Sequence, residues 1–81
     1  MNDTELREKL NKSDYLKYTD TFTWWVYNYK PDGYGYIKVI FDKVYKRFYI
    51  AGENDEPILD SYKMSNKHIY EWLLKGGWIN D

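Results

Sequence analysis

The sequence predicts an α+β fold: an N-terminal helix, an antiparallel meander of three or four strands, and a C-terminal helix packed on the sheet. Two observations predict the helices, because residues 1–12 and 65–76 each contain a capping residue followed by apolar positions three or four apart. A third observation predicts the sheet. Residues 21–50 are rich in β-branched and aromatic side chains and contain the turn sequence Pro-Asp-Gly at 31–33. All 81 residues are expected to form one small domain.

The first helix is expected to begin at Asp3 or Thr4, either of which is a good N-cap, and to run to about Lys12. The segment 13–16 then ends this helix or adds one further turn to it. Two apolar residues lie one turn apart and share a face of the helix: Leu6 and Leu10.

The aromatic-rich segment 23–41 is predicted to form a hairpin. The Pro-Asp-Gly sequence supplies a fixed φ at the first corner of the turn and a glycine that accepts a left-handed conformation at its end. If Lys30 lies opposite Tyr34, Val26 lies opposite Lys38, and the register of the whole hairpin follows. One face of the hairpin is then part of the core: Trp25, Tyr27, Ile37, Val39 and Phe41.

Residues 36–50 have two interpretations. Their apolar positions fit one face of an amphipathic helix, which gives a two-stranded hairpin with three helices. The segment contains no Ala, Leu, Met, Glu or Gln, however, and these residues favour helices most. We therefore predict a strand to Phe41, a turn at 42–45 and a second strand over 46–50.

The C-terminal part of the chain is predicted from its turns and caps. A turn is expected at 52–55, and PILDSY at 57–62 is a candidate edge strand, because Pro is tolerated where a strand starts. Ser65 is the expected N-cap of the last helix and Gly76 ends it, after which the chain folds back against the helix or sheet. The complete predicted core is Trp25, Tyr27, Ile37, Val39, Phe41, Phe48, Ile69, Trp72 and Leu73.

The composition excludes several classes of protein. Twelve basic and 13 acidic residues give a net charge of −1, which excludes a strongly basic nucleic-acid binder and a strongly acidic DNA mimic. The N-terminus lacks the apolar run of a signal peptide, and no stretch approaches the ~20 apolar residues that cross a bilayer. We expect a cytoplasmic protein with no membrane partner. Ten Lys against two Arg, with a single Ala, are typical of a low-GC bacterium or one of its mobile elements.

Charge is unevenly distributed along the chain. Residues 21–50 contain five bases and two acids, a net of +3, whereas residues 51–62 contain four acids and no base, a net of −4. A basic segment beside an acidic one can steer a partner, although such asymmetry is also common on solvated surfaces.

Catalytic chemistry has little support in the sequence. His68 is the only His, there is no Cys to pair with it, and no Gly-x-Ser-x-Gly sequence supplies a nucleophile. The carboxylates of 53–60 lack the full pattern of a calcium loop, and Gly-Tyr-Gly at 33–35 lacks the residues that complete a phosphate loop. We therefore expect no enzyme activity, no metal site and no cofactor.

The aromatic residues are the best functional lead. The chain has ten Tyr, four Trp and three Phe, and Tyr and Trp are enriched where proteins bind one another. We predict a non-enzymatic binding protein that acts on a protein partner through an aromatic surface. The predicted contact residues lie near the hairpin turn and on the basic strands: Tyr29, Lys30, Tyr34, Tyr36, Lys38, Lys46 and Arg47.

Three alternatives use the same residues. Rings interleaved with bases are typical of modules that bind single-stranded nucleic acid, although no RNP-like octamer is present. Clustered aromatic rings also stack on sugars, and a second copy of the chain is a further partner for such a surface. In its general character, a short aromatic-rich chain without a catalytic set, the sequence is similar to the small inhibitors encoded by bacteriophages and mobile elements. This similarity favours an inhibitor or modulator.

Overall fold

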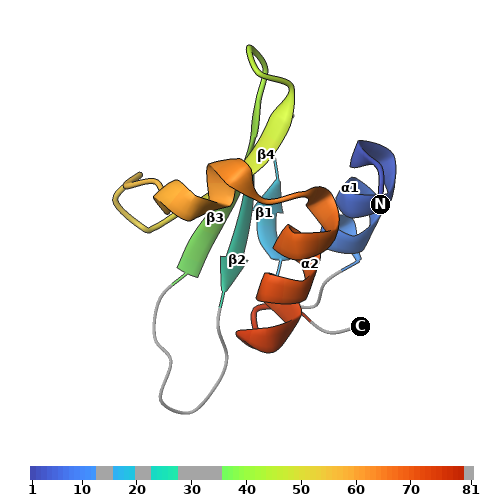
Figure 1. Cartoon of the computed structure of the whole chain (residues 1–81). Coiled ribbons are helices and arrows are strands. Elements are labelled where there is room, and N and C mark those ends of the chain that lie inside the picture. The colour runs from blue at the N-terminus through green and yellow to red at the C-terminus, as the bar shows by residue number, and fades with distance from the viewer. Residues whose placement is uncertain (13–15, 20–22, 28–35, 80–81) are drawn as a thin grey trace.

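The fold is taken from a computed structural model, which describes residues 1–12, 16–19, 23–27 and 36–79 (Figure 1). In these described residues two α-helices, one near each end of the sequence, flank four strands and one 3-10 helix, which confirms the predicted α+β fold with an antiparallel meander. In chain order the elements are α1 (Asp3–Asn11), β1 (Leu16–Thr19), β2 (Thr23–Tyr27), β3 (Tyr36–Asp42), β4 (Arg47–Ala51), η1 (Leu59–Lys63) and α2 (Asn66–Lys75).

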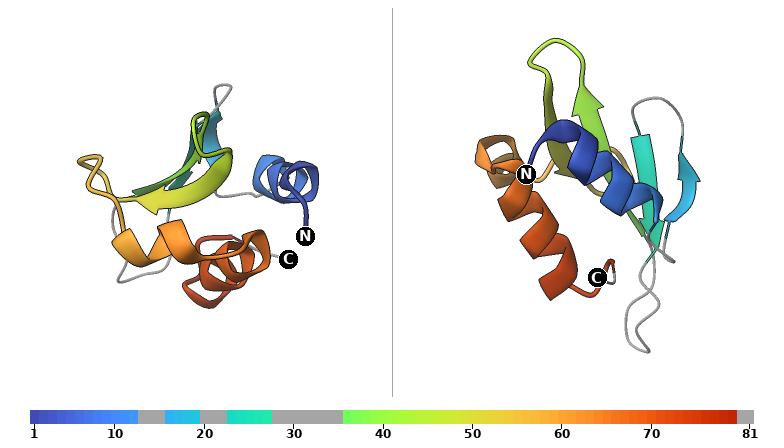
Figure 2. Two further views of the ribbon diagram at one scale, coloured as in Figure 1. Left: turned by 45° about the horizontal axis from the view of Figure 1, so that its top comes forward. Right: turned by 90° about the vertical axis from the view of Figure 1, so that its right-hand side faces the viewer.

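The molecule has two layers. One layer is the antiparallel sheet, in which the strands lie in the order β1-β2-β3-β4. The other layer contains α1, η1 and α2, which lie on the same face of the sheet (Figure 2, left). No described helix lies on the opposite face, so the two faces of one sheet have different surroundings.

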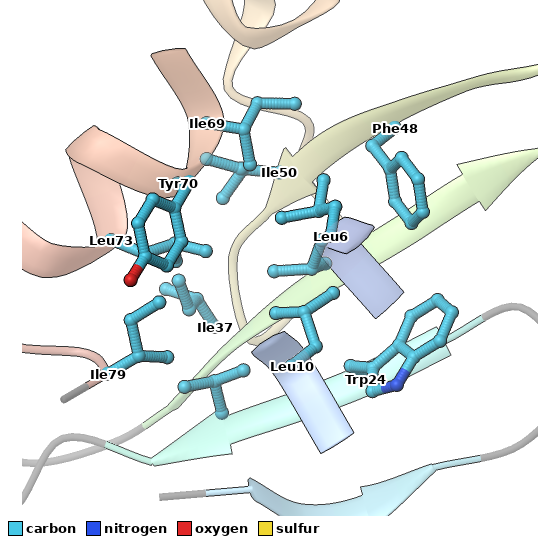
Figure 3. Packing of buried hydrophobic residues seen from close by; sticks show 12 residues of the cluster. Leu6, Leu10, Trp24, Ile37, Phe48, Ile50, Ile69, Tyr70, Leu73 and Ile79 are labelled. Carbon is cyan, nitrogen blue, oxygen red and sulfur yellow. The ribbon is translucent and has the colours of Figure 1, made fainter. Parts of the chain in front are cut away.

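The core fills the space between the sheet and the helices, where side chains from both layers converge (Figure 3). Of the predicted core residues, Ile37, Val39, Phe48, Ile69 and Leu73 are buried, as expected. Two further predicted members are only partly buried and pack against this cluster: Phe41 and Trp72. The buried apolar residues that the prediction left out are Leu6, Leu10, Trp24, Val26, Ile50, Ala51, Tyr70 and Ile79.

The predicted register of the hairpin is wrong by one residue. Trp24 lies opposite Val39 and Val26 opposite Ile37, whereas the prediction placed Val26 opposite Lys38. Because side chains alternate between the faces of a strand, a shift of one residue moves every side chain of β2 to the other face. Trp24 and Val26 therefore enter the core, and Trp25 does not. The predicted contact of Lys30 with Tyr34 and the side chain of Tyr27 lie outside the described parts of the chain.

The start of the chain differs from the prediction in two details. The N-cap of α1 is Asn2, rather than Asp3 or Thr4, because the Asn2 side chain accepts a hydrogen bond from the Glu5 amide at 2.8 Å. Leu16 begins a strand instead of ending a helical turn. The reason is tertiary, since β1 pairs along β2 and its backbone groups find partners there.

Residues 36–50 form two strands, so the helical alternative is wrong and the two-strand prediction is confirmed within one residue at each end. The turn between them is held by Asp42, whose carboxylate accepts hydrogen bonds from the amides of Val44 at 2.8 Å and Tyr45 at 3.1 Å. Lys46 closes the turn with a φ of 54°. Residues other than Gly adopt this left-handed conformation only rarely, so the turn has a specific backbone conformation.

The candidate edge strand at 57–62 is not a strand. A single bridge joins Pro57 to Ala51, and η1 follows. The edge of β4 at Ile50 is satisfied from two sides: the buried hydroxyl of Ser61 accepts a hydrogen bond from the Ile50 amide at 2.8 Å, and the Ile58 amide donates to the Ile50 carbonyl at 2.8 Å. These two contacts replace the strand that the sequence pattern suggested.

The last helix has the predicted ends. The Ser65 hydroxyl accepts a hydrogen bond from the His68 amide at 3.2 Å, and the helix ends at Gly76. Gly77 then adopts a φ of 76°, while the Trp78 amide donates to the Leu73 carbonyl at 2.9 Å, which is the hydrogen-bond pattern of a Schellman motif. This reversal returns the chain to the helix layer. The residues after the helix pack as expected: Trp78 against the core and Ile79 within it.

Candidate functional site

The face of the sheet that lies opposite the helices is the candidate site, and we call it the outer face. Successive side chains of a strand point to opposite faces of the sheet. The residues of the outer face are therefore those that precede or follow a buried core residue on the same strand. Cross-strand pairing places Trp25 beside Lys38 and Ile40 beside Tyr49. The described side chains of this face are Thr23, Trp25, Tyr36, Lys38, Ile40, Asp42, Arg47, Tyr49 and Ala51.

Two stacked aromatic pairs shape the outer face. The rings of Trp25 and Tyr36 are parallel within 15°, with centroids 5.1 Å apart. Tyr62 of η1 lies against Tyr49 at the β4 side of the face, with centroids 4.6 Å apart and an interplanar angle of 14°. All four side chains are half-buried. Because stacking fixes their positions, these rings form a rigid apolar surface.

Lys38 lies between the rings and is only 8% exposed. Its ammonium group lies 4.8 Å from the centroid of the Trp25 ring and forms an ion pair with Asp55. A buried cation needs such compensation, because desolvation of an unpaired charge is costly. The Asp55 carboxylate therefore balances the charge of Lys38 within the same chain.

The carboxylate of Asp55 comes from an acidic loop, residues 52–56, that follows β4. The Gly52 amide donates to the Glu56 carbonyl at 2.8 Å, and the Asp55 amide donates back to Gly52 at 3.1 Å. The Glu53 side chain accepts a hydrogen bond from the Tyr36 amide at 3.2 Å. These contacts attach the loop to the start of β3, so an acidic rim borders one end of the outer face.

The other end of the face is basic. The turn between β3 and β4, residues 43–46, extends past the helices at the top of Figure 1. Val44 and Tyr45 at its tip are 82% and 74% exposed. Lys46 and Arg47 beside them are also exposed. This end therefore presents two apolar side chains next to cationic ones.

The phenol of Tyr49 has a shifted pKa, and its surroundings explain the direction of the shift. Burial raises the pKa of Tyr49, and the neighbouring Tyr62 raises it further through its charge and a hydrogen bond, with smaller contributions from the carboxylates of Asp42 and Asp55. The hydroxyl is therefore protonated at neutral pH.

The structure describes four of the residues predicted from the sequence, and they lie in two places. Tyr36 and Lys38 are together on the outer face, and Lys46 and Arg47 are at the β3–β4 turn. The other predicted residues, Tyr29, Lys30 and Tyr34, lie outside the described parts of the chain.

Sequence reasoning missed several residues of the site. The alternation of polar and apolar residues in 47–51 identifies Tyr49 as outward-facing. No local pattern identifies the contact of Asp55 with Lys38, because 17 positions separate them in sequence. The residues missed are Trp25, Ile40, Tyr49, Asp55 and Tyr62.

The described residues contain neither a metal-binding cluster nor a pocket. Among them there is no group of three or more His, Asp or Glu side chains that could hold a metal ion, and no pocket is detected. His68 is exposed. No helix in the described part of the chain is long and apolar enough to cross a membrane.

Comparison with known proteins does not add to this picture. No protein-family model matches the chain, and no curated protein or solved structure is significantly similar to it. The geometry and chemistry of the outer face are therefore the basis on which a function can be proposed.

Proposed function

We propose that the chain is a non-enzymatic, cytoplasmic protein that binds a protein partner through its outer face and thereby inhibits or modulates that partner. The observation that supports this proposal is the pair of aromatic stacks on a sheet face without a covering helix among the described elements. Tyr and Trp supply large contact areas at a low entropic cost, and interfaces concentrate binding energy in such residues. A phage or mobile-element origin remains part of the proposal.

The charges near the rings favour a protein over single-stranded nucleic acid. A nucleic-acid surface combines free ring faces with cations that track the phosphates. Here each ring is stacked on another ring, and the cation between them is neutralised by Asp55. The exposed carboxylates of Glu53 and Glu56 border the same face and repel a polyanion. A protein interface accommodates both the apolar surface and the polar rim.

Affinity capture with matched variants tests the proposal. Wild-type protein and the double variant Trp25→Ala/Tyr36→Ala are immobilised, and proteins retained from a low-GC bacterial lysate are identified by mass spectrometry. We expect the wild type to retain a defined partner and the double variant to bind it at least about tenfold more weakly, since a tenfold change corresponds to ~1.4 kcal/mol. The purified partner is then assayed with and without the protein to establish inhibition or modulation.

A control on the helix layer makes the experiment specific. Lys67 and Glu71 are exposed on α2, on the opposite layer of the molecule. The variant Lys67→Ala/Glu71→Ala is expected to bind the partner like the wild type. Equal binding by wild type and Trp25→Ala/Tyr36→Ala would contradict the proposal. Retention of a single-stranded oligonucleotide instead, weakened by salt and by charge reversal at Lys46 and Arg47, would establish the nucleic-acid alternative.

A further inference from the structure

The outer face carries opposite charges at its two ends. Antiparallel pairing of β3 with β4 places the turn 43–46 at one end of the face and the acidic loop 52–56 at the other. Lys43, Lys46 and Arg47 are exposed at the first end, where the one described carboxylate, that of the half-buried Asp42, accepts hydrogen bonds from the turn amides, so the end is basic on balance. The carboxylates exposed at the second end belong to Glu53, Asp55 and Glu56.

A surface with this pattern is complementary to itself. A two-fold axis that lies between two such faces, perpendicular to their strands, reverses the strand direction of one copy relative to the other. The basic end of each copy then lies over the acidic end of its partner, and this happens twice in one dimer. We propose that the outer face pairs with the outer face of a second copy of the chain in this antiparallel, two-fold symmetric arrangement.

The residues between the charged ends suit a contact of this kind. Sheets that pack face to face lie ~10 Å apart, and the side chains between them are largely apolar. The half-buried side chains of Trp25, Ile40 and Tyr49 occupy this middle region of the face. Lys38, the lysine described in this region, is already paired with Asp55 and does not bring an uncompensated charge into the interface.

The dimer has a consequence for binding that rests on the proposed function. A second copy and the protein partner use the same face, so each excludes the other. Self-association then protects the aromatic rings while no partner is present, and the partner has to displace one chain. Exposed apolar patches of this kind favour unwanted association unless they are covered.

Charge reversal at each end tests the arrangement directly. Wild-type protein is expected to have the mass of two 10.0-kDa chains by size-exclusion chromatography with light scattering. The basic-end variant Lys46→Glu/Arg47→Glu is acidic at both ends, and the acidic-end variant Glu53→Lys/Glu56→Lys is basic at both ends. Each is expected to dissociate, with a dimer dissociation constant raised at least about tenfold, because like charges then face one another.

Mixing the two variants is the decisive step. When one basic-end variant pairs with one acidic-end variant in the antiparallel arrangement, an acidic end lies over a basic end at both contacts. A heterodimer with the mass of two chains is therefore expected. A head-to-tail contact would instead give longer assemblies, since it does not close. As a control, Lys67→Glu/Lys75→Glu on α2 changes the net charge as much as the basic-end variant does and is expected to remain dimeric. Circular dichroism verifies that every variant is folded.

The outcomes separate this inference from the proposed function. A wild-type mass of one chain overturns the dimer, as do reversed variants that stay dimeric or a mixture that forms no heterodimer. In any of these cases the protein partner can still be retained and still depend on Trp25 and Tyr36, which leaves the proposed function standing. A dimer that behaves as expected while no protein depends on these two residues supports the inference and removes the proposed function.

Discussion

Trp24 and Trp25 are consecutive residues of the same type, yet they have opposite surroundings. Trp24 is 3% exposed, lies 5.8 Å from the Phe48 ring, and donates its indole N–H to the Asn11 side chain at 2.8 Å. Trp25 is half-buried on the outer face, where its ring is stacked on Tyr36 and contacts Lys38. The first tryptophan joins the sheet to α1, and the second belongs to the surface that we propose for binding.

The difference shows that the aromatic residues serve two purposes in this chain. On the core face, rings supply apolar bulk that a small domain without disulfides needs. On the outer face, rings pack on one another, and this arrangement fixes their positions without burying them fully. The covering helices, and not the residue type, decide which purpose a given ring serves.

Alanine substitution of each tryptophan should give the largest difference in the free energy of unfolding between the core face and the outer face. We expect Trp24→Ala to lower the free energy of unfolding by about 3–5 kcal/mol, because it leaves a large cavity in the core. That loss is comparable to the whole stability of a small domain. Trp25→Ala should cost only about 1 kcal/mol, mainly the lost stacking on Tyr36. Urea denaturation followed by circular dichroism measures both, and equal losses would contradict the assignment of the two faces.

The sequence predicted the elements better than their register, and the two tryptophans show why. In β2 large apolar residues occur on both faces, so alternation alone does not say which of Trp24 and Trp25 is inside. The prediction took its register from the Pro-Asp-Gly turn, and it was wrong by one residue. In β4 buried and less buried residues alternate over Arg47–Ile50, and there the strand and its buried Phe48 were predicted correctly, although Ile50 was left out of the predicted core.

The second largest effect should come from the hydrogen bond that fixes Trp24. Asn11→Ala leaves the indole N–H in a partly buried position without its acceptor, which we expect to cost about 1–3 kcal/mol. In the background of Trp24→Phe, the ring has no N–H group that needs an acceptor. There Asn11→Ala should lower the free energy of unfolding much less. A double-mutant cycle from denaturation curves measures this coupling. Asn54→Ala, at an exposed position of the acidic loop, is the control.

The candidate site could be predicted only in part, because its key contact depends on the tertiary structure. Tyr36 and Lys38 lie two residues apart on one strand, so alternation is enough to place them on a common face. Asp55 reaches Lys38 only because the loop 52–56 turns back over the end of β3, with Asp55 at a φ of 65°. Neither the closure of a loop nor a left-handed aspartate is visible in local residue patterns.

A smaller effect should follow from removal of the charge on Asp55. Asp55→Asn keeps a residue type that tolerates a left-handed φ but leaves the buried ammonium group of Lys38 without its carboxylate. Because the Asp55 side chain is 73% exposed and solvent weakens its interaction, we expect a loss of only about 1 kcal/mol. Lys38→Met in the same background should recover stability. A loss of zero in Asp55→Asn would show that the outer face needs no internal charge compensation.

The smallest expected effect concerns how the free energy of unfolding falls at alkaline pH. Burial, followed by the neighbouring Tyr62, raises the pKa of Tyr49 above its usual value of 10.0, so the folded protein holds this proton more tightly than the unfolded chain does. The resulting stability is fully present below about pH 10 and is lost as the pH rises through the folded pKa. Tyr49→Phe should therefore lose less stability than the wild type between neutral pH and pH values above 10, as measured by urea denaturation at each pH.

Tyr45→Phe, which removes a 74% exposed phenol from the turn, is the matched control and should behave like the wild type. If Tyr49→Phe and the wild type lose stability in parallel, Tyr49 is solvated like a surface residue, and the outer face is less enclosed than its aromatic stacks indicate.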